Sequence, residues 1–222
     1  MIKFFYANTP NVIKVLILFK ELNLKYSLIP INVMKGVNKY KAFSDLFPYA
    51  KVPAVIDGDF KLYESSAILL HYGNQYSKFV FQNNPKLNAE MMASMFWLES
   101  DLLASLSTKF IIAKDLPHNT STDLLKIIDE RVEKNLYIVN LKLEGNHYLI
   151  SNTYSVADIE AFSLINAMHK RAPLDGNKYP NIIRWLNVIN QREAVISAFE
   201  EANQFNWEVA LSEDELIELI KA

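Results

Sequence analysis

The sequence predicts a small mixed α/β domain followed by an all-α domain, and two observations support this division. Within about the first 76 residues, segments with strand composition alternate with helically periodic ones in the order β-α-β-α-β-β-α. Beyond residue 88, apolar residues recur at spacings of three and four, which is typical of long helices that pack on one another. Half of the residues are hydrophobic, enough to give each of two domains a core.

The first half of the α/β segment reads as a strand, a helix and a second strand. Residues 2–7 are apolar and aromatic, and residues 26–33 return to the same composition. Between them, Thr9 and Pro10 open an apolar-periodic run, with Thr9 in the N-cap position and proline at the first helical position. A further helical segment ends at residues 48–50.

The second half reads as a hairpin and a closing helix. Residues 54–57 form a strand, Gly58 and Asp59 make the turn, and residues 60–63 return as the partner strand. A helix over 65–76 follows. This order of elements fits a thioredoxin-like unit, a mixed sheet with helices on its faces.

The expected domain organisation has four parts. Residues 1–76 form the thioredoxin-like domain, 77–87 a linker, 88–203 the helical domain and 204–222 a tail helix. The tail has a capped, amphipathic pattern, and it either docks on the core or, together with Trp207, closes over a substrate pocket as a lid.

Composition excludes several classes of protein. A net charge of −2 supplies no basic stripe, so nucleic acid is not an expected partner. No apolar run approaches the roughly 20 residues that span a bilayer, and residues 1–6 read as a strand rather than a signal, so we expect a cytoplasmic protein without a membrane partner. The four histidines lack ligand spacing and the chain has no cysteine, so we expect no metal site and no thiol of its own.

Val52 and Pro53 stand where the first hairpin strand begins. If their peptide bond is cis, the turn presents the backbone N–H and C=O of Val52 outward, ready to pair with a short extended peptide. A trans proline at the start of a strand is the alternative.

Glu64 and Ser65 stand where the next helix begins. The positive end of that helix and the Ser65 hydroxyl favour a carboxylate, while Glu64 suits an ammonium group, so the pair matches the two charges of an amino-acid head. A helix capped by serine is the alternative.

Tyr6, Thr9 and Asn11 surround the junction of the first strand and helix. A thiolate placed there would face backbone N–H groups, the Thr9 hydroxyl and the Asn11 amide, all of which favour the ionised form. Tyr6 offers a phenol as a rival donor. Thr9 as a helix cap and Tyr6 as core filling are the structural alternatives.

Together these motifs resemble the cytosolic glutathione transferase family, with the resemblance running from residue 1 to about 203. In the second half, residues 155–158, Ser-Val-Ala-Asp, resemble the family's capping box, to which we assign a structural role. Residues 179–185, Tyr-Pro-Asn-Ile-Ile-Arg-Trp, resemble another family signature.

The resemblance implies a homodimeric enzyme that uses glutathione as co-substrate, without a metal, on a small electrophile, in detoxification or in peroxide or disulfide reduction. The Val52 backbone beside Pro53 would hold the cysteinyl part of glutathione, Lys51 its glycyl carboxylate, and Glu64 with Ser65 its γ-glutamyl end. A non-catalytic regulator or binding protein with the same fold is the alternative function.

The group that activates the thiol varies among classes of the family. Thr9, Pro10 and Asn11 resemble the arrangement of the bacterial nu-type and yeast prion-related members, although Val12 replaces their glycine. Tyr6 lies near the tyrosine of mammalian-type members, but this chain lacks the Arg-Gly that follows it there. We therefore expect Asn11 and Thr9, rather than Tyr6, to stabilise the thiolate.

The helical domain contributes one further candidate. Asp101 lies where family members often place an acid that reaches the γ-glutamyl ammonium bound to the partner subunit, and a solvated helix charge is the alternative. We expect the electrophile pocket to lie between the two domains and to be lined by Phe96, Leu102, Ser105 and Lys109.

Overall fold

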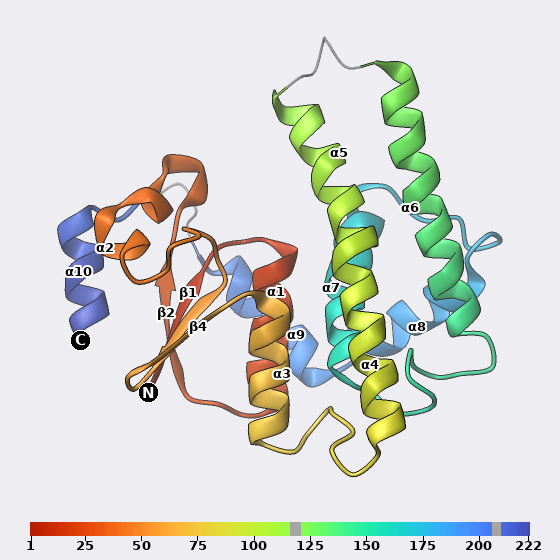
Figure 1. Cartoon of the computed structure of the whole chain (residues 1–222), viewed down its shortest axis with the longest axis horizontal. Helices are drawn as coiled ribbons and strands as arrows, with labels where there is room; N and C mark the ends of the chain where they lie inside the picture. The colour runs from red at the N-terminus through yellow and green to blue at the C-terminus, as the bar shows by residue number, and fades with distance from the viewer. Residues whose placement is uncertain (116–120, 206–209) are drawn as a thin grey trace. The chain divides into compact units, whose positions relative to one another are not determined.

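The computed structural model describes residues 1–115, 121–205 and 210–222 (Figure 1). The chain forms two compact units, one made of residues 1–78 and 190–222 and the other of residues 79–189. Helix α4 begins at Pro85, inside the segment expected to be a linker, and the last two helices pack with the N-terminal residues. The domain boundaries expected from the sequence stay a prediction, and Trp207 lies outside the described residues.

The first unit has the predicted thioredoxin-like order of strands and helices, with two short 3-10 helices before α2 and two helices from the end of the chain. Its elements are β1 (Ile2–Tyr6), α1 (Pro10–Glu21), β2 (Tyr26–Pro30), η1 (Val33–Lys35), η2 (Val37–Lys39), α2 (Lys41–Ser44), β3 (Ala54–Asp57), β4 (Phe60–Tyr63), α3 (Ser65–Gln75), α9 (Glu193–Asn203) and α10 (Glu213–Lys221). The α/β fold class predicted from the sequence is confirmed.

The four strands form one mixed sheet in the order β2-β1-β3-β4. β1 runs parallel to β2, whereas β3 is antiparallel to both β1 and β4. Gly58 and Asp59 form the two-residue hairpin turn, and Gly58 has a φ of +60°, a conformation that glycine adopts without steric cost.

Helices cover both faces of the sheet (Figure 1). α1 and α3 contact each other on one face, and α2 with α10 lies on the other. On this second face, Leu216 of α10 is fully buried in a hydrophobic cluster, so the tail helix docks on the first unit. The other buried members of the cluster are Phe5, Ile29, Ile31, Val37, Phe43, Phe47 and Ala54.

The second unit is helical, as predicted. Its elements are α4 (Pro85–Trp97), the π-helix η3 (Leu98–Leu103), α5 (Ala104–Asp115), α6 (Thr122–Lys142), α7 (Val156–Arg171) and α8 (Pro180–Asn190). No helix within the described residues has the length and apolar character needed to cross a membrane.

Asp158 of α7 joins three parts of the second unit. Its carboxylate accepts hydrogen bonds from the Ser155 N–H and Oγ at 3.0 Å each, from the Leu149 N–H at 2.9 Å and from Trp185 Nε1 at 3.0 Å. Burial raises the pKa of Asp158 to about 6, although these hydrogen bonds act in the opposite direction. The structural role assigned to this capping motif matches its contacts.

Candidate glutathione site

Three sequence motifs meet at one edge of the sheet because of the strand register. Phe5 of β1 pairs with Ala54 of β3, and Ala54 pairs with Tyr63 of β4. The end of β1 lies one residue beyond these pairs, and so do Pro53 and Glu64. Since β4 runs in the same direction as β1, helices α1 and α3 both begin at this edge.

The first motif is the turn that precedes β3. The peptide bond between Val52 and Pro53 is cis, the conformation that the sequence alone left open. Lys51 is exposed, Pro53 is buried and Val52 is partly buried. The approach to the turn is anchored by Asn38, whose Nδ2 donates to the Ala50 carbonyl at 2.7 Å. The Asn38 contact gave no signal in the sequence.

The second motif is the junction of β4 and α3. Glu64 occupies the N-cap position, with a φ of +70° and a ψ of 116°, so its backbone is in a region that costs a non-glycine residue on the order of 1–3 kcal/mol. Its side chain is exposed and makes no capping hydrogen bond. Such strain persists only where the surroundings impose it, and it is frequent at ligand sites.

Ser65 is the first residue of α3 rather than its cap, which corrects the alternative of a serine-capped helix. It is only 4% exposed, and the first turn of α3 contains no acidic residue. The helix end therefore presents its positive dipole and a buried hydroxyl without a carboxylate of its own first turn to neutralise them.

The third motif is the start of α1. Thr9 occupies the N-cap position as predicted, but its side chain makes no capping hydrogen bond, and no acid lies in the first turn. Asn11 is partly exposed, and its buried Oδ1 has no hydrogen-bond partner among the described residues. Both helices that begin at this edge thus have the same character, a positive end without a side-chain cap.

Tyr6 differs from Thr9 and Asn11 because its side chain is fully buried. Its ring lies 5.2 Å from the Phe205 ring and 5.9 Å, edge on, from the Phe4 ring. Burial, followed by the charge of Glu201, raises the pKa of Tyr6 well above its usual range. In this conformation the phenol is buried away from solvent.

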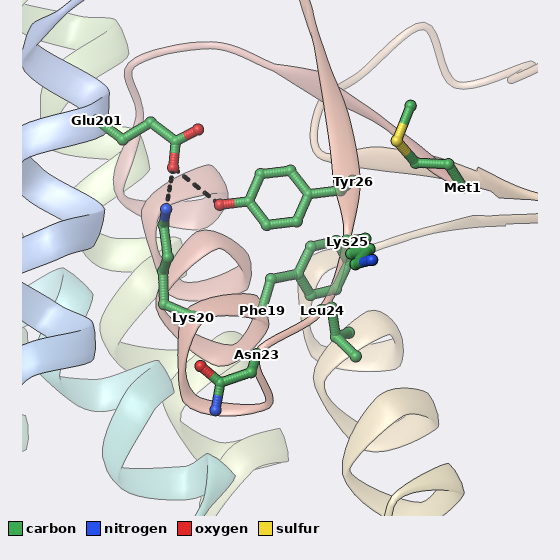
Figure 2. A pocket seen from close by; sticks show the side chains of 8 residues that line it. All are labelled: Met1, Phe19, Lys20, Asn23, Leu24, Lys25, Tyr26 and Glu201. Atoms are coloured by element: carbon green, nitrogen blue, oxygen red, sulfur yellow. Dashed lines mark hydrogen bonds and ion pairs between the residues drawn. The ribbon is translucent and has the colours of Figure 1, made fainter.

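Glu201 of α9 ties the tail of the first unit to α1 and β2 (Figure 2). It accepts a hydrogen bond from Tyr26 Oη at 2.8 Å and pairs with Lys20 Nζ at 2.5 Å. The hollow beside these residues measures about 510 Å³. It lies by Met1 and Tyr26, where β1 and β2 begin, so it is at the opposite end of the strands from the three motifs.

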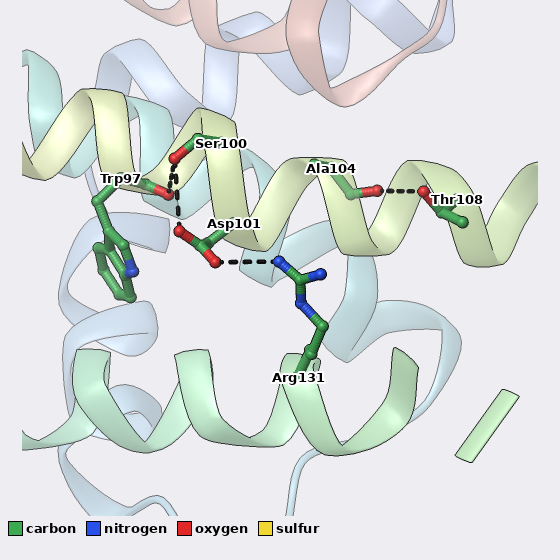
Figure 3. A network of polar contacts seen from close by, with 6 residues as sticks. All are labelled: Trp97, Ser100, Asp101, Ala104, Thr108 and Arg131. Carbon is green, nitrogen blue, oxygen red and sulfur yellow. Dashed lines mark hydrogen bonds and ion pairs between the residues drawn. The ribbon is translucent and has the colours of Figure 1, made fainter. Parts of the chain in front are cut away.

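Asp101 belongs to the second unit, where it lies in the π-helix η3. Figure 3 shows it pointing toward Arg131 of α6, whose Nη2 donates to Asp101 Oδ1 at 3.3 Å. Ser100 Oγ donates to its other oxygen at 3.4 Å. The Asp101 carboxylate remains 41% exposed. The four residues expected to line an electrophile pocket differ in burial, since Leu102 and Ser105 are buried whereas Phe96 and Lys109 are exposed.

Two tyrosines near the turn were missed in the sequence. Tyr49 is exposed and stacks edge on against Tyr63 at 5.2 Å, so an aromatic pair lies between the approach to Lys51 and the end of β4. Tyr49 precedes the hairpin and Tyr63 ends it, so the turn before β3, together with the hairpin register, brings the two rings together. Within the described ranges there is no group of three or more histidine and acidic side chains arranged to hold a metal ion.

The fold and these motifs define a two-unit protein with a thioredoxin-like part and a helical part. The family model of the glutathione S-transferase N-terminal domain matches residues 1–74, and the model of the C-terminal domain matches residues 102–193. The chain belongs to the glutathione S-transferase family.

Two relatives align with most of this chain and with most of their own length. A glutathione S-transferase domain-containing protein of Dictyostelium discoideum is 29% identical over 90% of this chain and 80% of its own. The disulfide-bond oxidoreductase YfcG of Escherichia coli is 27% identical over 91% of this chain and 96% of its own.

Among solved structures, glutathione transferase YghU from Streptococcus pneumoniae, complexed with glutathione, is 25% identical. It has a TM-score of 0.82 and covers 90% of this chain and 82% of its own.

Proposed function

We propose that this chain binds glutathione at the sheet edge formed by Val52, Glu64 and Ser65, and activates the thiol of the bound tripeptide. The observation that carries the proposal is the strand register, which joins the Val52–Pro53 turn to the starts of α1 and α3. The backbone of Val52 pairs with the cysteinyl residue, Lys51 attracts the glycyl carboxylate, and the α3 end with Ser65 binds the γ-glutamyl carboxylate.

Groups at the start of α1 favour ionisation of the thiol. The chain has no cysteine, so the reacting sulfur belongs to glutathione. Thr9 and Asn11 lie beside a helix end without a side-chain cap, and hydrogen bonds from such groups favour a thiolate. The buried Tyr6 is the weaker candidate because a ligand sulfur has no access to its hydroxyl in this conformation.

Two reactions fit this arrangement. In transfer, the thiolate attacks an electrophilic carbon, a C–S bond forms, and a leaving group or an adjacent atom takes the electron pair while the thiol proton passes to solvent. In disulfide reduction, one glutathione thiolate forms a mixed disulfide and a second one releases it as glutathione disulfide, supplying two electrons in all. The relationship to YfcG, named a disulfide-bond oxidoreductase, favours including the second reaction.

The proposal includes a homodimer working in the cytoplasm, where glutathione is the main thiol. In such a dimer Asp101 would approach the γ-glutamyl ammonium of a glutathione held by the partner. Its pairing with Arg131 leaves one carboxylate oxygen bonded only by Ser100 among the described residues.

Retention on immobilised glutathione, with elution by free glutathione, tests binding. Turnover of an activated aryl halide and of a mixed disulfide, each with glutathione, then separates an enzyme from a regulator. Retention and turnover support the proposal. Retention without either turnover supports a glutathione-binding protein that is not an enzyme, and failure to bind contradicts the proposal and favours the non-catalytic regulator.

A further inference from the structure

The tail helix α10 supplies a part of the core that the thioredoxin-like unit would otherwise lack. α2 is only four residues long, too short to cover one face of a four-stranded sheet. Leu216 fills this space and is 0% exposed, against strand residues Phe5 and Ala54 and the α2 residue Phe43. The second face of the sheet is therefore completed by residues from the end of the chain.

The same cluster supports two residues next to the candidate site. Val52, which precedes the cis proline, and Tyr63, which precedes Glu64, both pack against the cluster that contains Leu216. Their side chains thus rest on a core whose packing depends on α10. Interiors are close-packed, so a void at Leu216 would be felt by these neighbours.

Hydrogen bonds also hold α10 against the α/β part of the first unit. Glu213 Oε1 accepts a hydrogen bond from the Ala42 N–H at 2.9 Å, and thereby caps α2, whose own first turn contains no acid. At the other end of α10, Lys3 Nζ donates to the Ile220 carbonyl. Both ends of the tail helix are thus joined to the α/β unit by hydrogen bonds.

The segment that α10 holds leads directly into the glutathione turn. From η1 the chain runs through η2 and α2 to Lys51 and Val52, and Asn38 links the middle of this path to Ala50. The helices of residues 33–52 are all short, and helices of this length have little stability of their own. The segment therefore relies on contacts with its surroundings.

We infer that α10 is a positioning element for the glutathione site: by holding residues 33–52 it keeps the Val52 backbone in the conformation that pairs with glutathione. The inference rests on the proposed function and adds a residue, Leu216, that touches no substrate. Its loss lowers the population of the binding-competent segment, and apparent affinity falls in proportion to that population.

The first experiment compares Leu216→Ala with Leu219→Ala in the full chain. Leu219 lies on the same helix but is 39% exposed, so it controls for the loss of a leucine from α10. We expect Leu216→Ala to weaken glutathione binding by about tenfold, as for a binding-competent population reduced to about a tenth, and to speed amide exchange in residues 33–52. Leu219→Ala should change neither. Calorimetric titration and hydrogen–deuterium exchange measure both effects.

If Leu216→Ala does not fold, a second pair of variants, Glu213→Ala and Asp214→Ala, tests whether α10 positions the glutathione site. Both remove an acid from the first turn of α10, but only the Glu213 carboxylate bonds the Ala42 N–H among the described contacts. Weaker binding with faster exchange in 33–52 for Glu213→Ala alone supports the inference. Unchanged affinity with faster exchange confined to α10 overturns it.

The exchange measurement also separates the two proposals. If the unmodified protein binds no glutathione, the proposed function fails, and with it the link to affinity. Faster exchange in residues 33–52 would then still support the holding role of α10, and unchanged exchange there would overturn that role as well.

Discussion

Ala54 of β3 pairs with Tyr63 of β4, and this register makes Pro53 and Glu64 neighbours at the end of the hairpin. A cis peptide bond and a residue with positive φ therefore lie side by side at the edge where α3 begins. The turn offers backbone hydrogen bonds to an extended peptide, and the helix end offers a positive dipole to a carboxylate. This pairing places the two halves of a tripeptide-binding site next to each other.

Replacement of Ser65 by alanine should weaken glutathione binding much more than it weakens folding. Loss of a hydroxyl that donates to a carboxylate costs about 1.5–3 kcal/mol of binding free energy. Ser121→Ala is the matched control, because Ser121 caps α6 through a 3.2 Å bond from the Asp123 N–H. That variant should lose about 0.5–2 kcal/mol of stability with unchanged affinity. Thermal melts and glutathione titrations of both variants make the comparison, and unchanged affinity in Ser65→Ala would exclude the assigned role.

The backbone of Glu64 predicts an unusual order of stability. At most positions alanine is more stabilising than glycine, but at a φ of +70° the alanine side chain is strained. Glu64→Gly should therefore unfold with a free energy about 1 kcal/mol higher than Glu64→Ala. Both variants should bind glutathione more weakly, since both lack the carboxylate proposed for the ammonium group. Urea unfolding provides the test, and a more stable alanine variant would show that the Glu64 backbone is not strained.

The buried Asp158 predicts a pH dependence of stability. Burial raises its folded pKa from 3.8 to about 6, so its contribution is fully present below the ordinary aspartate pKa and is lost as pH rises through 6. A shift of about two pKa units corresponds to about 3 kcal/mol. The unfolding free energy of the natural protein, minus that of Asp158→Asn, should therefore fall by about that amount between roughly pH 4 and pH 7.

Asp129→Asn serves as the control for this titration, because Asp129 is an exposed partner of Lys109. The unfolding free energy of Asp129→Asn should differ little from that of the natural protein, because exposed ion pairs contribute little to stability. If the Asp158→Asn difference is also flat in urea unfolding curves, the carboxyl is not protonated in the folded protein above its ordinary pKa.

Local elements of this fold were predictable, whereas contacts between distant segments were not. The hairpin of residues 54–63 follows from a Gly-Asp turn between two apolar runs, and α1 from a proline after Thr9. The cis bond at Pro53 was left open because trans is the more common form of any X–Pro bond.

The contacts of α10 show why sequence patterns did not give the rest of the site. Its amphipathic pattern predicts a helix with one buried face, but not the surface that it covers. The hydrogen bond from Ala42 to Glu213 spans 171 residues, and no local signal specifies it. Likewise, the buried Tyr6 ring contacts Phe205, from the other end of the chain.

In the proposed function, groups at the start of α1 ionise the thiol of bound glutathione. The most direct test is the ultraviolet absorbance of the bound thiolate as a function of pH, in the natural protein, Asn11→Ala and Tyr6→Phe. Asn11→Ala should raise the pKa of the bound thiol by about one unit, since it removes a hydrogen bond to the charged form, whereas Tyr6→Phe should leave that pKa unchanged. An unchanged thiol pKa in Asn11→Ala, together with a raised one in Tyr6→Phe, would contradict the claim and assign the activation to the phenol.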